Sequence, residues 1–233
     1  MVDKILKQLK DLGDPQIVKV WKRHGAGDNL YGVSLVKLKD FSKDFKKNTT
    51  LAVDLWKSGN LDARFLATMI CEPRKLPKAV IYEWLENISY YFLCDVFVTN
   101  VASRSPFAVD FMRKWTFSEN EYTKRAGYML LSKLAGKEKA VSDAEFEAYL
   151  DIIRANIHAE RNRAREAMNL ALIAIGKRNK PLNRYALITA NNIGQVDIDH
   201  GETNCKTPFA PEVLTDKKVI SKLGTLQEEL VEF

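Results

Sequence analysis

The chain has 233 residues, 46% hydrophobic and 28% charged, which is enough apolar material for a sizeable core and too much for a disordered protein. Its longest apolar runs are far shorter than the roughly 20 residues of a membrane-spanning helix, and three separated cysteines make neither a disulfide framework nor a paired zinc motif. With a net charge of +6, we therefore expect a soluble, cytoplasmic protein without cofactor, metal or membrane contact.

Apolar residues recur at helical spacing along almost the whole chain, and alternating strand patterns are nearly absent. The pattern is clear in residues 5–12, 51–56, 80–88 and 149–157. We predict about twelve short helices. The segments between them contain helix-breaking residues, at Asp14-Pro15, Gly25 to Gly32, Ser58 to Asn60, Glu72-Pro73, Ser105-Pro106, Gly136, Lys180-Pro181 and Gly194.

Helix start signals agree with this division of the chain. Asp14 before a proline predicts an N-cap with proline at the first helical position, while Ser118 and Ser142, each followed three residues later by Glu, predict capping boxes. Short loops between helices force antiparallel neighbours, so serial pairs predict an all-α superhelix of about six HEAT-like repeats. A compact all-α bundle is the alternative.

The last part of the chain changes character. We place the repeat domain at residues 1–194, and at residues 195–233 a polar loop with an acidic C-terminal extension that packs on the same domain. The loop brings together Asp199, His200, Glu202 and Cys205, which are metal-ligand types, but their spacing fits no common zinc pattern. We expect a hydrogen-bonded loop that closes the end of the superhelix.

Basic residues are concentrated in the body of the chain. Residues 197–233 carry eight acidic and four basic side chains, so residues 1–196 carry 32 basic and 22 acidic ones. In stacked helix pairs, corresponding helix ends lie side by side, so cations at similar phase would form one stripe along a phosphate backbone. A scatter of solvated charges is the alternative. The predicted DNA-binding residues are Lys124, Arg154, Arg161, Arg163, Arg165, Lys177 and Arg178.

Asp95 is the one charged residue of an otherwise apolar and aromatic helix expected at Ile88 to Val98. Tyr91 lies four residues earlier, so the two side chains share a helix face. An aromatic ring and a carboxylate on one face can together stabilise a cation. The alternative role of Asp95 is a salt bridge or a helix-packing hydrogen bond.

Four stretches in order resemble one known family over roughly residues 1–190. They are Leu30-Tyr-Gly-Val33, residues 61–70, Ser89 to Asp95, and Trp115 followed by residues 121–130. The chain resembles the AlkD-type DNA alkylation repair family, the HEAT-like-repeat alkylpurine DNA glycosylases. This resemblance implies a protein that binds double-stranded DNA, alkylated or branched, in a concave basic groove and hydrolyses the glycosidic bond of cationic N3- or N7-alkylated purines. We expect the protein to be a monomer.

The resemblance also implies roles for individual residues. Asp95 matches the key carboxylate of the family, which would stabilise oxocarbenium charge and position water, Tyr91 stands where the catalytic Trp is, and Arg125 matches the active-site Arg. Phe92 replaces the first Asp of the family signature and Leu170 a second lesion-facing Trp, so lesion stacking should be weaker. Three hypotheses stay open: a glycosylase, a non-catalytic binder of DNA structures, and a protein-interaction scaffold.

Overall fold

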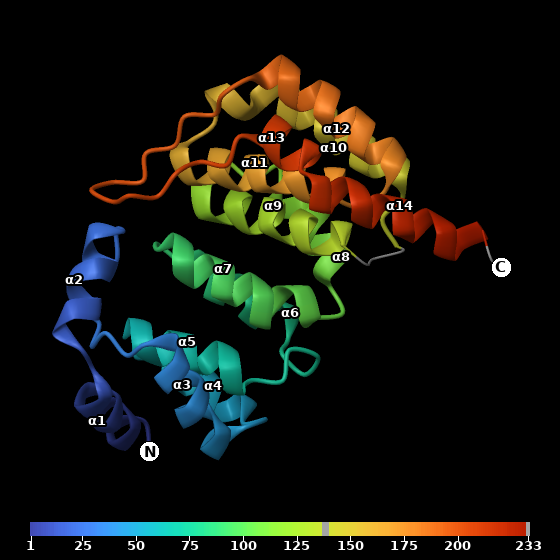
Figure 1. Cartoon of the computed structure of the whole chain (residues 1–233). Coiled ribbons are helices and arrows are strands. Elements are labelled where there is room, and N and C mark those ends of the chain that lie inside the picture. The colour runs from blue at the N-terminus through green and yellow to red at the C-terminus, as the bar shows by residue number, and fades with distance from the viewer. Residues whose placement is uncertain (137–139, 232–233) are drawn as a thin grey trace. The chain divides into compact units, whose positions relative to one another are not determined.

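The computed structural model describes residues 1–136 and 140–231, with the side chains of residues 225–231 left out, and Figure 1 shows these residues as helices joined by loops. Within that part of the chain there is no strand, so the all-α class is confirmed. The chain divides into two compact units, residues 1–108 with 200–204, and residues 109–199 with 205–233. The domain boundary expected after residue 194 stays a prediction.

The first unit has its core where α4 packs on α5 and α5 on α7. Trp56 of α4 stacks on Trp84 of α6, with ring centroids 4.4 Å apart. The unit contains α1 (Val2–Leu12), α2 (Pro15–Arg23), α3 (Leu35–Phe41), the 3-10 helix η1 (Ser42–Phe45), α4 (Thr49–Lys57), α5 (Leu61–Ile70), α6 (Lys78–Glu86), α7 (Tyr91–Asn100) and the 3-10 helix η2 (Ala102–Arg104).

The second unit is built around α11, which packs on both α9 and α12, while α10 packs on α12. Phe111 and Trp115 stack one turn apart on α8, with ring centroids 4.3 Å apart. The unit contains α8 (Ala108–Trp115), apart from its first residue, then α9 (Glu121–Ala135), α10 (Asp143–Asn156), the 3-10 helix η3 (Ile157–Ala159), α11 (Asn162–Gly176), α12 (Lys180–Ile193), α13 (Ala210–Thr215) and α14 (Lys217–Val231).

Two of the three predicted N-caps are confirmed. The Asp14 carboxylate accepts a hydrogen bond from the Gln16 amide at 2.8 Å, and the Ser142 hydroxyl accepts one from the Glu145 amide at 3.1 Å. The prediction for Ser118 is wrong, because α9 begins only at Glu121 and Asn120 caps it by accepting from two backbone amides. Ser118 instead accepts from the Asn120 amide, so it supports the turn before the cap.

A buried carboxylate holds the turn between α2 and α3 in place. Asp62 of α5 is fully buried and accepts hydrogen bonds from the backbone amides of Tyr31, Gly32 and Val33. Burial raises the pKa of the Asp62 carboxyl, and the three N–H donors oppose that shift. Gly32 has φ of +78°, and a Cβ there would lie 2.5 Å from the Asp14 carbonyl oxygen, so this turn requires glycine.

The C-terminal extension contains two helices, α13 and α14, after an irregular segment that follows Gly194. Leu214 of α13 is fully buried, so this helix belongs to the core of the second unit. Residues 232–233 of the acidic extension lie outside the described residues. In the described part of the chain, no helix combines the length and apolar character that crossing a bilayer requires.

Candidate nucleic-acid interface

One face of α7 lines a cavity of about 620 Å³ in the first unit, which we call the α7 pocket. Phe92, Asp95, Val96 and Thr99 follow the spacing i, i+3, i+4 and i+7, so all four point from the same side of the helix. The helix begins directly before them, at Tyr91. The other walls come from α3, from η1 and the residue after it, from the C-terminal end of α5 and the loop that follows, and from Arg104 of η2.

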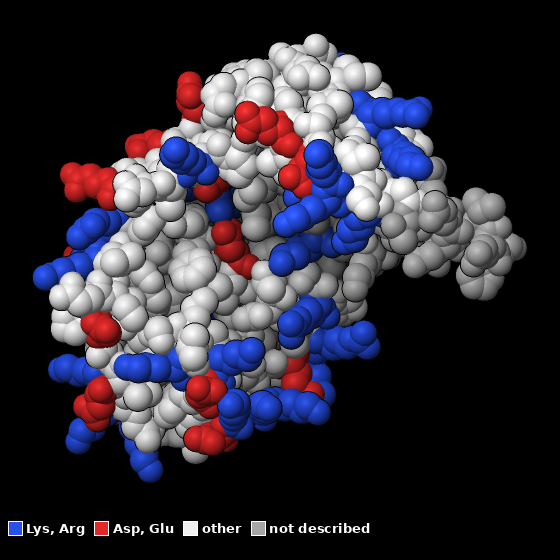
Figure 2. Space-filling view, viewed as in Figure 1, with Lys and Arg blue, Asp and Glu red and all other residues white. Residues whose placement is uncertain are grey.

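The α7 pocket is rich in positive charge. Lys39, Lys43, Lys46 and Arg104 line it, and Asp95 is the one carboxylate among the described residues of its lining. Lys43 pairs with Asp40 at 2.7 Å, whereas the side chains of the other three cations make no hydrogen bond or ion pair with any described residue. Figure 2 shows Lys and Arg side chains gathered, with some carboxylates, over the part of the first unit that holds α3 and α4.

The apolar wall of the pocket is built on aromatic packing. The Phe92 ring lies 5.5 Å from that of Phe65 and 6.4 Å from that of Trp21, both edge-on, which fixes its orientation. Cys71 also lines the pocket, and burial raises the pKa of its thiol to about 12. At neutral pH this thiol is therefore protonated and chemically inert.

Tyr91, predicted to face a lesion beside Asp95, is held by a residue at the C-terminal end of α2. Its hydroxyl lies 3.1 Å from Nδ1 of His24, and the two rings pack edge-on with centroids 6.1 Å apart. The aromatic side chain that lines the α7 pocket together with Asp95 is Phe92, three residues before it. His24 lines a second, polar cleft with the loop residues 201–204.

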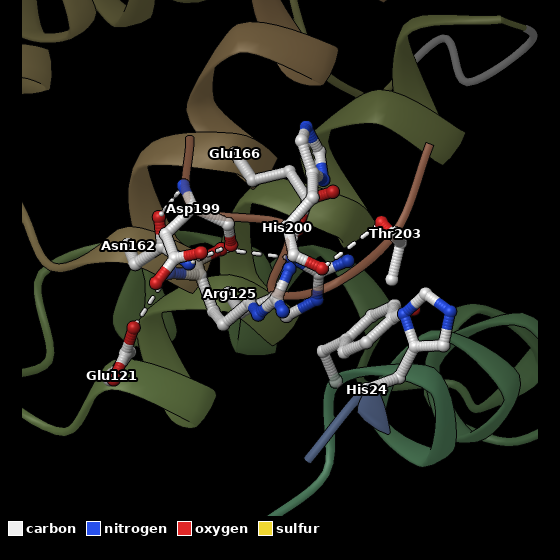
Figure 3. A network of polar contacts seen from close by, with 10 residues as sticks. His24, Glu121, Arg125, Asn162, Glu166, Asp199, His200 and Thr203 are labelled. Carbon is white, nitrogen blue, oxygen red and sulfur yellow. Dashed lines mark hydrogen bonds and ion pairs between the residues drawn. The ribbon is translucent and has the colours of Figure 1, made fainter. Parts of the chain in front are cut away.

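Arg125, predicted as the active-site Arg, belongs to a buried ion-pair network in the second unit (Figure 3). It is 1% exposed, and its Nη1 donates to Oε2 of Glu166 at 2.8 Å and to the Arg163 carbonyl at 3.0 Å. Glu166 also accepts from Nη1 of Arg163, and Glu121 accepts from the Arg163 amide. The network ties α9 to α11, so both arginines hold helices together.

Two more of the predicted DNA-binding cations share one acidic residue. Glu160 accepts from Nζ of Lys124 through its carboxylate and from the Arg165 guanidinium through its backbone carbonyl. Arg165 also donates to the Asp197 carbonyl at 2.9 Å. These two cations therefore fasten the start of α11 to its surroundings in the second unit.

Of the remaining predicted cations, some form ion pairs and others have no ion-pair partner among the described residues. Arg154 pairs with Asp151 of its own helix, and Arg178 donates to Asp143 at 2.9 Å and to the Ala135 carbonyl. Arg161 and Lys177 are exposed, and their side chains form no hydrogen bond or ion pair with the described residues. The structure thus brings Asp95 together with Lys39, Lys46 and Arg104, a set that the prediction did not contain.

The polar loop after Gly194 is hydrogen-bonded as expected. Asn162 and Asp199 exchange two hydrogen bonds of 2.8 Å within the second unit, and Thr203 donates to the His200 carbonyl within the first (Figure 3). Among the described residues, no group of three His, Cys, Asp or Glu side chains lies close enough to hold a metal ion.

The chain is similar to several known proteins. The family profile of the DNA alkylation repair enzymes matches residues 5–212. Uncharacterised proteins Lin0241 of Listeria innocua and Lmo0209 of Listeria monocytogenes are 30% and 29% identical over 215 residues, which cover 89% of this chain and 93% of each relative.

A solved structure gives the same fold. It is described as "A new family of proteins related to the HEAT-like repeat DNA glycosylases with affinity for branched DNA structures". The match has a TM-score of 0.86 at 26% identity and covers 96% of both chains. The prediction of an α–α superhelix of HEAT-like repeats is thereby confirmed, against the compact bundle.

Proposed function

The chain belongs to the family of DNA alkylation repair enzymes, and we propose that it binds DNA, with branched DNA preferred over a plain duplex. The observation that carries this proposal is the set of three cations, Lys39, Lys46 and Arg104, that line the α7 pocket without an ion-pair partner among the described residues. The affinity of the solved relative for branched DNA structures supports it.

A Lys or Arg side chain without an ion-pair partner can bind phosphate at a low cost in free energy. A Lys or Arg that already forms a buried ion pair must break that pair before it contacts DNA, which leaves a carboxylate unpaired. Arg125 and Lys124 are in this position, whereas the ion pair of Arg178 with Asp143 is partly exposed. Lys39, Lys46 and Arg104 exchange only water and counterions for phosphate, and counterion release favours binding.

Fluorescence anisotropy with a labelled four-way junction and a duplex of the same arm sequence tests this function. We expect tighter binding of the junction, and weaker binding of both DNAs by Lys46→Ala and Arg104→Ala. Lys57→Ala is the matched control, because this exposed lysine of α4 lies outside the pocket. Binding that is undetectable at low salt would contradict the proposal and favour the protein-interaction scaffold.

Excision of cationic alkylpurines is a second candidate function, favoured by the placement of Asp95. This carboxylate is partly exposed in the α7 pocket, where an apolar wall strengthens its field. A water oxygen would bond to C1′ as the C1′–N bond breaks, the bond electrons would neutralise the cationic base, and a water proton would pass to solvent. Asp95 would stabilise the oxocarbenium charge and orient the water.

Release of N7-methylguanine from alkylated duplex DNA distinguishes the two functions. If the chain is an enzyme, Asp95→Asn should lower the excision rate about 100-fold or more while DNA affinity stays nearly unchanged. If the native protein releases no base above the spontaneous rate and still binds the junction, the chain binds DNA structures without catalysis.

A further inference from the structure

The α7 pocket is larger and more apolar than the binding of a phosphate alone requires. We propose that this pocket holds one unpaired nucleotide of a branched DNA, with its phosphate on the cationic rim and its base against Phe92. This inference rests on the proposed DNA binding. A base pair beside a branch point is less well stacked than one inside a continuous duplex, so a branched DNA yields an unpaired nucleotide at lower cost. This occupant would explain why the chain binds branched DNA more tightly than a continuous duplex.

The cations of the pocket come from two sides. Lys39, Lys43 and Lys46 follow the spacing i, i+4 and i+7 through α3, η1 and the residue after it, so they share one side of that segment. Arg104 comes from η2, after α7. A phosphate between them would meet two or more positive groups, and the Arg fork can bind two of its oxygens at once.

The size and the apolar wall point to a nucleotide instead of a lone anion. A volume of about 620 Å³ falls among small-molecule sites, which span about 300–1,000 Å³. Met69 and Val96 line the pocket as well as Phe92, and none of these side chains can bind phosphate. A base gains stacking and apolar burial there, and base–aromatic stacking contributes about 1–3 kcal/mol.

The polar groups of the wall indicate which base fits. A carboxylate accepts hydrogen bonds and cannot donate them, so Asp95 favours a base edge with adjacent N–H donors. Among the four DNA bases, guanine offers such a pair at N1 and N2. Asn100 also lines the pocket, and its Nδ2 donates a hydrogen bond to the Thr68 hydroxyl at 3.1 Å. We therefore expect guanine to be preferred at this position.

Titration calorimetry of the full chain with free nucleotides tests the pocket directly. Deoxyguanosine 5′-monophosphate should bind, while deoxyguanosine and inorganic phosphate should each bind about tenfold more weakly or worse. Lys46→Ala combined with Arg104→Ala should abolish the preference for the phosphorylated form, and Lys57→Ala should change nothing. Asp95→Asn should remove the preference for guanine over thymine, measured as the ratio of the two nucleotide affinities.

The outcomes separate this inference from the proposed function. Junction binding without any nucleotide binding at millimolar concentration would overturn the pocket and leave DNA binding in place. Nucleotide binding without junction binding would overturn the proposed DNA binding and leave a nucleotide pocket in place. Inorganic phosphate that binds as tightly as the nucleotide would reduce the site to an anion site and overturn the inference. Circular dichroism confirms that each variant is folded, so a loss of binding reports on the pocket.

Discussion

The Arg125 guanidinium of α9 donates to the Glu166 carboxylate of α11 at 2.8 Å, and the arginine side chain is 1% exposed. The resemblance to the AlkD-type family implies an active-site role for this arginine, and its contacts hold two helices of the second unit together. A buried pair gives little net stabilisation when both partners are present, but removing one partner leaves an uncompensated charge. The first prediction follows from this asymmetry.

Arg125→Ala should lower the free energy of unfolding by about 3 kcal/mol, because a cavity is left between the helices and Glu166 keeps only the ion pair with Arg163. Glu166→Gln should be milder, since the amide oxygen still accepts from the guanidinium. Urea unfolding followed by circular dichroism measures both, with the exposed Arg154→Ala as the control that should change little. An Arg125→Ala variant as stable as the native chain would show that this arginine is not structural.

Asp62→Ala should destabilise the first unit by about 3 kcal/mol or more, since three backbone amides lose their acceptor. Asp62→Asn keeps one acceptor oxygen but turns an N–H₂ group toward backbone donors, so we expect an intermediate loss. Amide hydrogen exchange at Tyr31 and Val33 measures the effect locally. Unchanged exchange at both amides in Asp62→Ala would contradict the role assigned to this carboxylate.

Local signals in the sequence predicted the helices well. Asp14 and Ser142 are adjacent to the amides they cap, so a short window of sequence contains the whole interaction. Ser118 failed because Asn120 competes for the same helix start from two residues closer. The apolar helix expected from Ile88 begins only at Tyr91, since residues 88–90 form the preceding connection.

Long-range pairing is what the sequence could not show. Lys124 and Glu160 are 36 positions apart, and Arg178 and Asp143 are 35 apart. Only the packed helices therefore reveal that these cations already form ion pairs. The repeated spacing of Lys39, Lys43 and Lys46 was readable as one helical side. What turned it into a candidate site was η2, which brings Arg104 to the same pocket.

The Arg113–Glu145 pair predicts a pH dependence of stability. Two hydrogen bonds of 2.8 Å from Arg113 hold the pKa of the Glu145 carboxyl below its ordinary value of 4.5. A lowered folded-state pKa gives stability that is present above 4.5 and lost as the pH falls through the folded value. The Tm difference between the native chain and Arg113→Ala should therefore be largest near neutral pH and vanish in acid. A difference that grows in acid would contradict this.

The salt dependence of junction binding tests the central claim, that the α7 pocket cations and not the predicted stripe bind phosphate. The comparison uses two triple variants with equal charge loss, one with Ala at Lys39, Lys46 and Arg104, the other with Ala at Arg154, Arg161 and Lys177. The slope of log affinity against log salt falls by about one unit for each phosphate that no longer meets a cation. We predict a slope reduced by about two to three units for the first variant and nearly unchanged for the second. The opposite result would place the interface on the predicted stripe, at Arg154, Arg161 and Lys177, and contradict the account.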